Sequence, residues 1–117
     1  MNELRRGDVV DVDLEPVRGS ETGKVRPAVV VTNNTYNARV PVIQIVPITG
    51  WNPKKEKILT NVVLEPSKAN GLTKVSIADC LQTRPVDQRY RVKKVRGKLN
   101  TETMEAINQA IAIVFEL

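Results

Sequence analysis

The segment 16–27 gathers the residue types that can bind a phosphate and act on it. It holds Gly19 and Gly23, the carboxylate of Glu21, and Arg26 just before the apolar run 28–31. A loop of this length in a small domain is more often functional than incidental, and glycines let the backbone approach a ligand closely. Arginine stays charged at physiological pH and matches the geometry of a phosphate. The loop therefore predicts an anion site at Arg26, against the alternative of a solvated arginine that happens to precede a proline.

Thr49 and Glu21 are the residues that could assist a cation at such a site. Thr49 closes a predicted strand, where its hydroxyl could hydrogen-bond a phosphate oxygen. Glu21 could accept a proton from a ribose 2′-hydroxyl. Both also have ordinary interpretations, because threonine often ends a strand and a surface salt bridge of a loop glutamate contributes little to stability.

A second group of carboxylates lies on the first predicted strand, where Asp11, Asp13 and Glu15 alternate with apolar residues. This alternation places the three on one face of the strand, and hard cations such as Mg²⁺ take oxygen ligands. Magnesium sites, however, generally draw their ligands from separate elements and from the substrate. We therefore interpret this face as solvent-facing, and we expect neither a metal site nor a cofactor.

A basic group with one aromatic residue follows Thr49. Trp51 could stack on an unpaired base, and the neighbouring lysines could attract phosphates. Aromatic residues make up only 3% of the chain, so a broad stacking platform is not expected, and a merely solvated basic surface is the alternative. The cations of this group are Lys54, Lys55 and Lys57, with Arg84, Arg89, Arg91, Lys93 and Lys94 further along the chain.

The overall composition limits the classes of function. A length of 117 residues suits one domain spanning 1–117. Lys and Arg total 18 against 13 acidic residues, for a net charge of +5 and a pI of about 9.6. This balance favours an anionic partner, with nucleic acid the leading candidate. The chain has no histidine, which removes the usual general base near neutral pH and the commonest transition-metal ligand.

Cysteine usage and hydropathy point to a compartment. Cys80 is the single cysteine, so no internal disulfide can form and a reducing cytosol is the natural setting. The start of the chain lacks a signal-like apolar stretch, and no run approaches the roughly 20 apolar residues that cross a bilayer. We expect a cytoplasmic protein with no membrane contact.

The elements that must position these residues are many short strands followed by one helix. Strands are predicted over 8–15, 27–32, 40–48, 60–64, 75–82 and 90–98, with a single helical turn over 66–71. After Asn100, a plausible N-cap, Met104, Ile107, Ile111 and Val114 recur at helical spacing. Because there is no βαβ alternation, the predicted fold is mainly β (α+β), an antiparallel barrel-like sheet with a C-terminal α-helix packed against it.

Three motifs resemble those of a known family. They are the runs 5–10 (RRGDVV), 19–30 (GSETGKVRPAVV) and 46–49 (VPIT), supported by 81–87 (LQTRPVD) and the closing helix. The chain resembles the MazF/PemK family of toxin endoribonucleases over nearly its full length. The first run is a weak signal alone, whereas the second run followed by the third at this separation is a strong one.

This resemblance implies a fold, a reaction and partners. The fold is an SH3-like antiparallel β-barrel of the CcdB/Kid/MazF type with a C-terminal helix, assembled as a homodimer. The reaction is metal-independent, sequence-specific cleavage of single-stranded RNA. Toxins of this family are neutralised by a small cognate antitoxin whose disordered tail occupies the RNA groove.

The resemblance also assigns roles to residues. The family's arginine and threonine pair matches Arg26 and Thr49, and its loop glutamate matches Glu21. The expected mechanism is attack by the RNA's own 2′-hydroxyl, with Arg26 stabilising the phosphorane-like charge, Thr49 fixing a phosphate oxygen and Glu21 as the base. The products would be a 2′,3′-cyclic phosphate and a 5′-hydroxyl. The expected RNA-binding residues are Arg18, Ser20, Trp51, Lys54, Lys55, Lys57, Gln82 and Arg84.

One difference from the family pattern and two rival functions bear on this assignment. Some relatives in the PemK branch use a histidine and an aspartate, so the lack of histidine favours the MazF-like arrangement. A gyrase-poisoning toxin on the same fold would use the end of the terminal helix, where 113–117 (IVFEL) lacks the expected tryptophan. A non-catalytic RNA-binding barrel would not require Arg26, Thr49 and Glu21 together.

Overall fold

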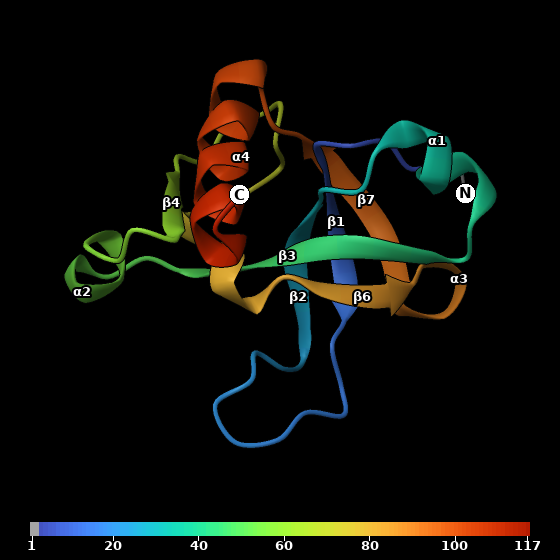
Figure 1. Cartoon of the computed structure of the whole chain (residues 1–117), viewed down its shortest axis with the longest axis horizontal. Helices are drawn as coiled ribbons and strands as arrows, with labels where there is room; N and C mark the ends of the chain where they lie inside the picture. The colour runs from blue at the N-terminus through green and yellow to red at the C-terminus, as the bar shows by residue number, and fades with distance from the viewer. Residues whose placement is uncertain (1–2) are drawn as a thin grey trace.

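An antiparallel sheet with one long helix packed against it forms the framework of residues 3–117, the part of the chain that the computed structural model describes (Figure 1). The strands are β1 (Asp8–Asp13), β2 (Val25–Val30), β3 (Val42–Gly50), β4 (Asn61–Leu64), β5 (Ser76–Asp79), β6 (Arg84–Asp87) and β7 (Val92–Lys98). The helices are α1 (Asn34–Arg39), α2 (Pro53–Glu56), the 3₁₀ turn η1 (Cys80–Gln82), α3 (Gln88–Arg91) and α4 (Thr101–Phe115). Within these residues no helix has both the length and the apolar character needed to cross a bilayer.

The long strand β3 joins the two parts of the sheet. The strand order is β4-β5-β3-β2-β1-β7, with β6 also pairing with β3. One edge of β3 pairs with β2, while the other pairs with β6 over Val42 to Ile45 and with β5 over Ile48 to Gly50. All of these pairings are antiparallel. The last residues of β3 extend beyond its pairing with β6 and lead to α2, as Figure 1 shows.

The segment between β4 and β5 closes the sheet onto β7. The amide of Lys98 donates to the carbonyl of Ala69 at 2.8 Å. A Cβ added at Gly97 would lie 2.2 Å from that same carbonyl oxygen, so only glycine allows this close approach. The predicted helical turn is present as one turn in which the Gly71 amide donates to the Ser67 carbonyl at 3.0 Å, and Gly71 has the positive φ of +69° that such a position favours.

Two apolar clusters lie on opposite faces of the sheet, because the central strands place apolar residues side by side. Val29 and Val30 are neighbours in β2, and each contributes to a different cluster. This confirms a central strand in this region, although β2 spans Val25–Val30 rather than the predicted 27–32. The cluster away from α4 consists of Leu4, Val10, Val12, Leu14, Ala28, Val30, Ile43, Ile45, Val86 and Val92.

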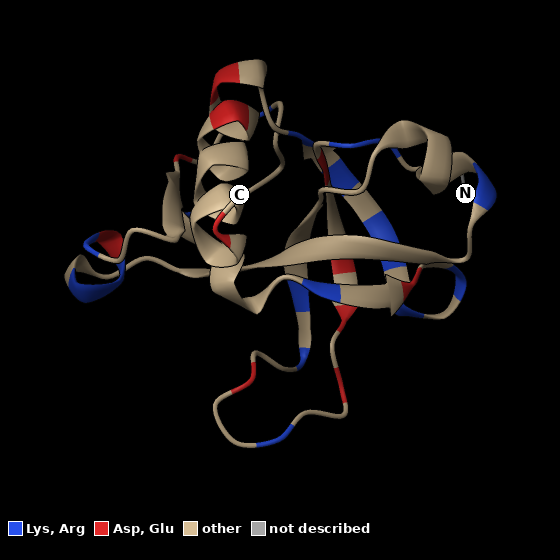
Figure 2. Cartoon of the chain, in the orientation of Figure 1, with Lys and Arg blue, Asp and Glu red and all other residues tan. Residues whose placement is uncertain are grey.

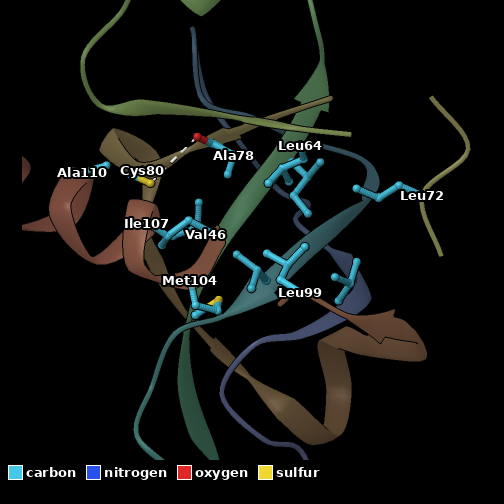
Figure 3. Packing of buried hydrophobic residues seen from close by; sticks show 12 residues of the cluster. Val46, Leu64, Leu72, Ala78, Cys80, Leu99, Met104, Ile107 and Ala110 are labelled. Carbon is cyan, nitrogen blue, oxygen red and sulfur yellow. Dashed lines mark hydrogen bonds between the residues drawn. The ribbon is translucent and has the colours of Figure 1, made fainter. Parts of the chain in front are cut away.

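Helix α4 covers the other cluster, and the sequence predicted both its start and its buried face. The side chain of Asn100 caps it by accepting from the Thr103 amide at 2.8 Å. Figure 3 shows Met104, Ile107 and Ala110 on the sheet-facing side of the helix, and Ile107 is fully buried. Cys80, also fully buried, lies in this cluster with its thiol donating to the Ala78 carbonyl at 3.9 Å.

Three short helices were not predicted. Each begins at a polar residue whose side chain accepts a hydrogen bond from a backbone amide of the first turn: Asn33 for α1, Asn52 for α2 and Asp87 for α3. Each cap is a single local side chain, and Asn33, directly after the run predicted as a strand over 27–32, opens a helix. The strand predicted over 75–82 ends at Asp79, the strand predicted over 90–98 begins at Val92, and β6 was missed.

Candidate active site at the ends of β2 and β3

Arg26 and Thr49 occupy matching positions on neighbouring strands. Ala28 of β2 pairs with Pro47 of β3, and Val30 pairs with Ile45. Continuing this antiparallel register by two residues sets Arg26 opposite Thr49, and directly opposed residues project from the same face of a sheet. Sheet pairing therefore brings together two side chains that are far apart in the sequence.

A hollow of about 320 Å³ opens where these two side chains lie. Both are only partly buried, so a ligand can reach them. Its wall contains three cationic side chains and no carboxylate among the described residues that form it, so its local potential is positive and favours an anion. The lining residues are Lys24, Val25, Arg26, Pro27, Ile48, Thr49, Gly50, Lys74 and Ser76.

The guanidinium of Arg26 is held in place from the glycine-rich loop. Its Nε–H donates to the Gly23 carbonyl at 2.8 Å. Its two terminal nitrogens have no hydrogen-bond partner within residues 3–117. One edge of the planar group is thus fixed, while the other is free for the bidentate contact that suits a phosphate.

Thr49 has a partner of its own. Its Oγ1 accepts a hydrogen bond from the ammonium of Lys55 at 3.3 Å, and the same ammonium donates to the Gly50 carbonyl at 3.0 Å. Lys55 belongs to α2, the short helix that follows β3. Among the described residues, it is the lysine expected to bind RNA that hydrogen-bonds to Thr49, although it does not line the hollow itself.

Glu21 lies in a different, neighbouring hollow. Its Oε1 accepts from the Arg18 amide at 2.5 Å, within the loop itself. The structure therefore brings together two of the three predicted catalytic residues and leaves the third, Glu21, outside their hollow. This second hollow measures about 560 Å³ and is lined by Ser20, Glu21, Gln82, Thr83, Arg84 and Pro85.

Gln82 and Arg84 anchor the loop between the two hollows. The Gln82 side-chain oxygen accepts from the Thr22 amide at 2.7 Å, and Arg84 Nη1 donates to the Leu14 carbonyl at 3.3 Å. Thr22 is the immediate neighbour of Gly23, whose carbonyl holds Arg26. The two residues expected to bind RNA thus also fix the loop that positions Arg26.

The two glycines of the loop are required by the conformation and packing of the loop itself. A Cβ on Gly23 would lie 2.7 Å from both Glu15 Oε1 and Val17 Cγ2, so the space that glycine leaves is filled by the loop's own side chains. Gly19 has a φ of +57°, a conformation that glycine adopts at little cost. The glycines permit this tight folding rather than a close approach to substrate.

The other predicted RNA-binding residues lie around the hollows. Trp51 is 41% exposed just beyond Thr49, and its ring N–H donates to Glu56 Oε1 at 2.8 Å. Lys54 is exposed on α2 and Lys57 is exposed at its C-cap. Figure 2 shows blue segments at α2, which extends to the left of the sheet in that view. Arg18 is exposed in the loop and lines neither hollow.

The basic residues further along the chain do not join this site. Arg89 and Arg91 belong to α3, and Lys93 and Lys94 belong to β7. Strand β7 pairs with β1 on the side opposite to β2, so β1 separates these cations from Arg26. The side chain of Arg91 donates to the Asp13 carbonyl at 3.0 Å and thereby braces the end of β1.

The carboxylates of β1 and its loop are engaged with the chain's own groups. Asp11 forms an ion pair with Arg96 at 2.6 Å. Asp13 accepts from the Glu15 amide, and Glu15 accepts from the Lys24 amide. Across residues 3–117 no three His, Cys, Asp or Glu side chains gather in the manner of a metal site. Asp11 and Asp13 are partly buried rather than fully solvated, so the interpretation as a solvent face holds only for Glu15.

Two cations of the hollow were missed by sequence reasoning. Lys24 directly precedes β2, and Lys74 comes two residues before β5. Lys74 reaches the site because Ser76 pairs with Gly50 across the β3–β5 ladder. No local pattern in the sequence signals that pairing.

The chain is similar to known proteins over almost all of its length. Residues 5–115 match the family model described as PemK-like, MazF-like toxin of type II toxin-antitoxin system. An endoribonuclease MazF from Staphylococcus saprophyticus is 41% identical over 110 residues, which cover 94% of this chain and 89% of that protein.

Solved structures share the fold. MazF from Deinococcus radiodurans superposes with a TM-score of 0.83 at 20% identity, covering all of both chains. A mycobacterial endoribonuclease in complex with its cognate antitoxin gives a TM-score of 0.77 at 22% identity, covering 97% of this chain and 96% of that one. The fold is therefore the mainly β, α+β architecture of MazF structures, as the sequence predicted. By its family match and its identity to a curated relative, the chain belongs to the PemK-like, MazF-like toxins of type II toxin-antitoxin systems.

Proposed function

We propose that the chain is an endoribonuclease toxin that cleaves single-stranded RNA by using the RNA's own 2′-hydroxyl as the nucleophile. The observation that carries this proposal is the hollow in which Arg26 and Thr49 lie together with Lys24 and Lys74. A cationic hollow of this kind suits a backbone phosphate. The 41% identical relative is an endoribonuclease, which supports the same reaction here.

The reaction needs four things from the protein. The 2′-oxygen must be held in line with the P–O5′ bond, its proton must be removed, the added charge on the phosphoryl oxygens must be stabilised, and the departing 5′-oxygen must gain a proton. The 2′-oxygen forms a bond to phosphorus as the P–O5′ bond breaks. The products are a 2′,3′-cyclic phosphate and a 5′-hydroxyl, and no metal ion takes part.

Arg26 is the charge stabiliser in this proposal. Its free guanidinium edge supplies two parallel N–H donors, and its charge persists throughout the reaction. Thr49 donates its hydroxyl to a second phosphoryl oxygen. Both groups are fixed before substrate arrives, Arg26 by the Gly23 carbonyl and Thr49 by its place at the end of β3.

Glu21 remains our candidate for the base. It lies in the adjoining hollow, bonded to the Arg18 amide, and the same loop carries Gly23, which contacts Arg26. A shift of the loop when RNA binds would bring the carboxylate to the 2′-hydroxyl. Without that shift, Glu21 contacts the RNA beside the scissile phosphate.

The RNA path follows from the two hollows. Ser20, Gln82 and Arg84 line the second hollow, so RNA that crosses Arg26 continues along them. Trp51 offers a ring that its Glu56 contact holds in place, and a neighbouring unpaired base can stack on it. Arg18 and the lysines of α2 extend the positive potential along the strand.

Two kinds of protein partner accompany this function. We propose a homodimer, since Phe115 and Leu117 at the end of α4 are exposed and line a hollow of about 420 Å³ together with Val31 and Ile111. We also propose neutralisation by a cognate antitoxin with a disordered tail, as solved relatives include complexes with an antitoxin. The proposed substrate is cellular RNA, so we place the protein in the cytoplasm.

Analysis of product ends tests the reaction. A long single-stranded RNA of defined sequence is incubated with the protein in excess EDTA, and the new ends are sequenced. We expect 5′-hydroxyl ends and 2′,3′-cyclic phosphates, and no cleavage once the nucleotide that carries the attacking oxygen is replaced by its 2′-deoxy form. New 5′-phosphate ends, or inhibition by EDTA, would contradict the proposal.

A further inference from the structure

The contact between Lys55 and Thr49 has a chemical consequence beyond placing one more positive charge near the RNA. The Lys55 ammonium lies 3.3 Å from Thr49 Oγ1 and 3.0 Å from the Gly50 carbonyl. It bridges the last two residues of β3. Within residues 3–117, it is the lysine of α2 and its surroundings whose ammonium hydrogen-bonds to Thr49.

This contact decides which way the threonine hydroxyl can point. A hydroxyl has one hydrogen to donate and two lone pairs that accept. An ammonium can only donate, so toward Lys55 the Thr49 oxygen must act as acceptor. The Thr49 hydrogen is then directed elsewhere, and the hollow that Thr49 shares with Arg26 is where an anionic acceptor would bind.

The structure holds Lys55 in position from both ends of the residue. Its amide donates to the Asn52 side chain at 2.8 Å, and its carbonyl accepts from the Asn61 side chain at 3.1 Å. Asn61 belongs to β4, so the helix is tied to the sheet as well as to its own N-cap. Because the Lys55 backbone is fixed at both its amide and its carbonyl, its side chain starts from a fixed position when it reaches Thr49.

We propose that Lys55 is a positioning residue that orients the Thr49 hydroxyl toward the scissile phosphate. The inference rests on the proposed RNA cleavage and deepens it. Lys55 fixes the direction of the hydroxyl proton before the charge develops on the phosphate, which is the preorganisation that favours a transition state over a ground state. Its effect therefore belongs in kcat more than in KM.

A double-mutant cycle tests this role. The rates of Lys55→Met, Thr49→Ala and the double variant are measured on a short RNA that contains one cleavage site, at saturating and at limiting concentration. We expect Lys55→Met to lower kcat about tenfold with a smaller change in KM. In the Thr49→Ala background the same substitution should change kcat less than about twofold, since the hydroxyl it orients is gone.

Two further variants separate orientation from charge. Lys55→Arg keeps a donor to Thr49, and we expect it to restore most of kcat. Lys68→Met removes one lysine from the exposed turn that packs near β7, and we expect wild-type kcat, which makes it the matched charge control. Thermal melting of Lys55→Met should match the parent protein.

The outcomes distinguish this inference from the proposed function. A Lys55→Met effect that is equally large without Thr49, or no larger than that of Lys68→Met, would overturn the positioning role while leaving RNA cleavage intact. A parent protein that fails to cleave RNA at all would instead overturn the proposed function itself.

Discussion

Among single residues, Arg26 and Thr49 were the most predictable part of the site. Each lies near the end of a strand whose apolar run can be recognised in the sequence, and a strand end offers a rigid support for a side chain. Glu21 was less predictable, because its place depends on a loop that is anchored by Gln82, 60 residues further along the chain. The place of Lys74 in the site was not predictable for a similar reason, since only the pairing of β5 with β3 brings it near Gly50.

The role of Glu21 can be tested at the residue scale with Glu21→Gln. If Glu21 removes the 2′-proton, kcat should fall by about 10²-fold or more, because general bases contribute on that order. Rates on a single-site RNA give the result. Glu105→Gln on the exposed face of α4 is the control. Retention of the parent rate by Glu21→Gln would assign proton removal to another group.

Cys80 provides a second test at this scale. Burial, with a smaller contribution from the charge of Asp79, raises the pKa of its thiol to about 12. The native thiol keeps its proton between pH 9 and 12 while the unfolded thiol loses it, so this group makes the fold less stable as the pH rises through that range. Iodoacetamide at pH 8 should leave the native protein unmodified and alkylate it in urea. Rapid alkylation without urea would contradict this burial.

Secondary-structure elements were predictable where their pattern is long and regular. The helix after Asn100 shows a period of about 3.6 residues, the first strand alternates with a period of 2, and β2 carries a β-branched run; all three elements are present. The helices α1, α2 and α3 are four to six residues long, too short for a period to be recognised. They depend on single capping side chains, which resemble turn residues in a sequence.

The closure of the sheet can be tested with Gly97→Ala. The added Cβ would lie 2.2 Å from the Ala69 carbonyl oxygen, a backbone atom that cannot move without opening the contact between the 65–72 segment and β7. We expect the free energy of unfolding to fall by about 1–3 kcal/mol, the usual range for overpacking, as measured by urea denaturation. Gly50→Ala, where the nearest atom is the Lys74 ammonium at 3.5 Å, should cost less. Equal losses in the two variants would contradict this account of the closure.

For the whole molecule, composition predicted the sign of the partner's charge but not the location of the site. The net charge of +5 is spread over several surfaces, as Figure 2 shows. The described cations of β7 and α3 lie across β1 from the active hollow. Only the fold separates the basic groups that line the proposed RNA path from those, such as Arg91 and Arg96, that bond to β1.

Assembly is the property to test at this scale. The apolar end of α4, with Phe115 57% and Leu117 91% exposed, should be covered in the homodimer. Light scattering after size exclusion should give twice the chain mass of 13.0 kDa. We expect Phe115→Glu to shift the protein to a folded monomer with a lower melting temperature, because the stabilisation from association is lost. A dimer that is unaffected by this substitution would place the interface elsewhere.

The most direct measurement is the cleavage rate of Arg26→Ala on a defined single-stranded RNA in excess EDTA, beside the parent protein and Arg39→Ala as a control on the exposed end of α1. Removing one preorganised donor group of this kind lowers rates by about 10²–10³-fold or more, and we expect at least that loss for Arg26→Ala, with parent rates for Arg39→Ala. An Arg26→Ala protein that still cleaves at the parent rate would contradict the account.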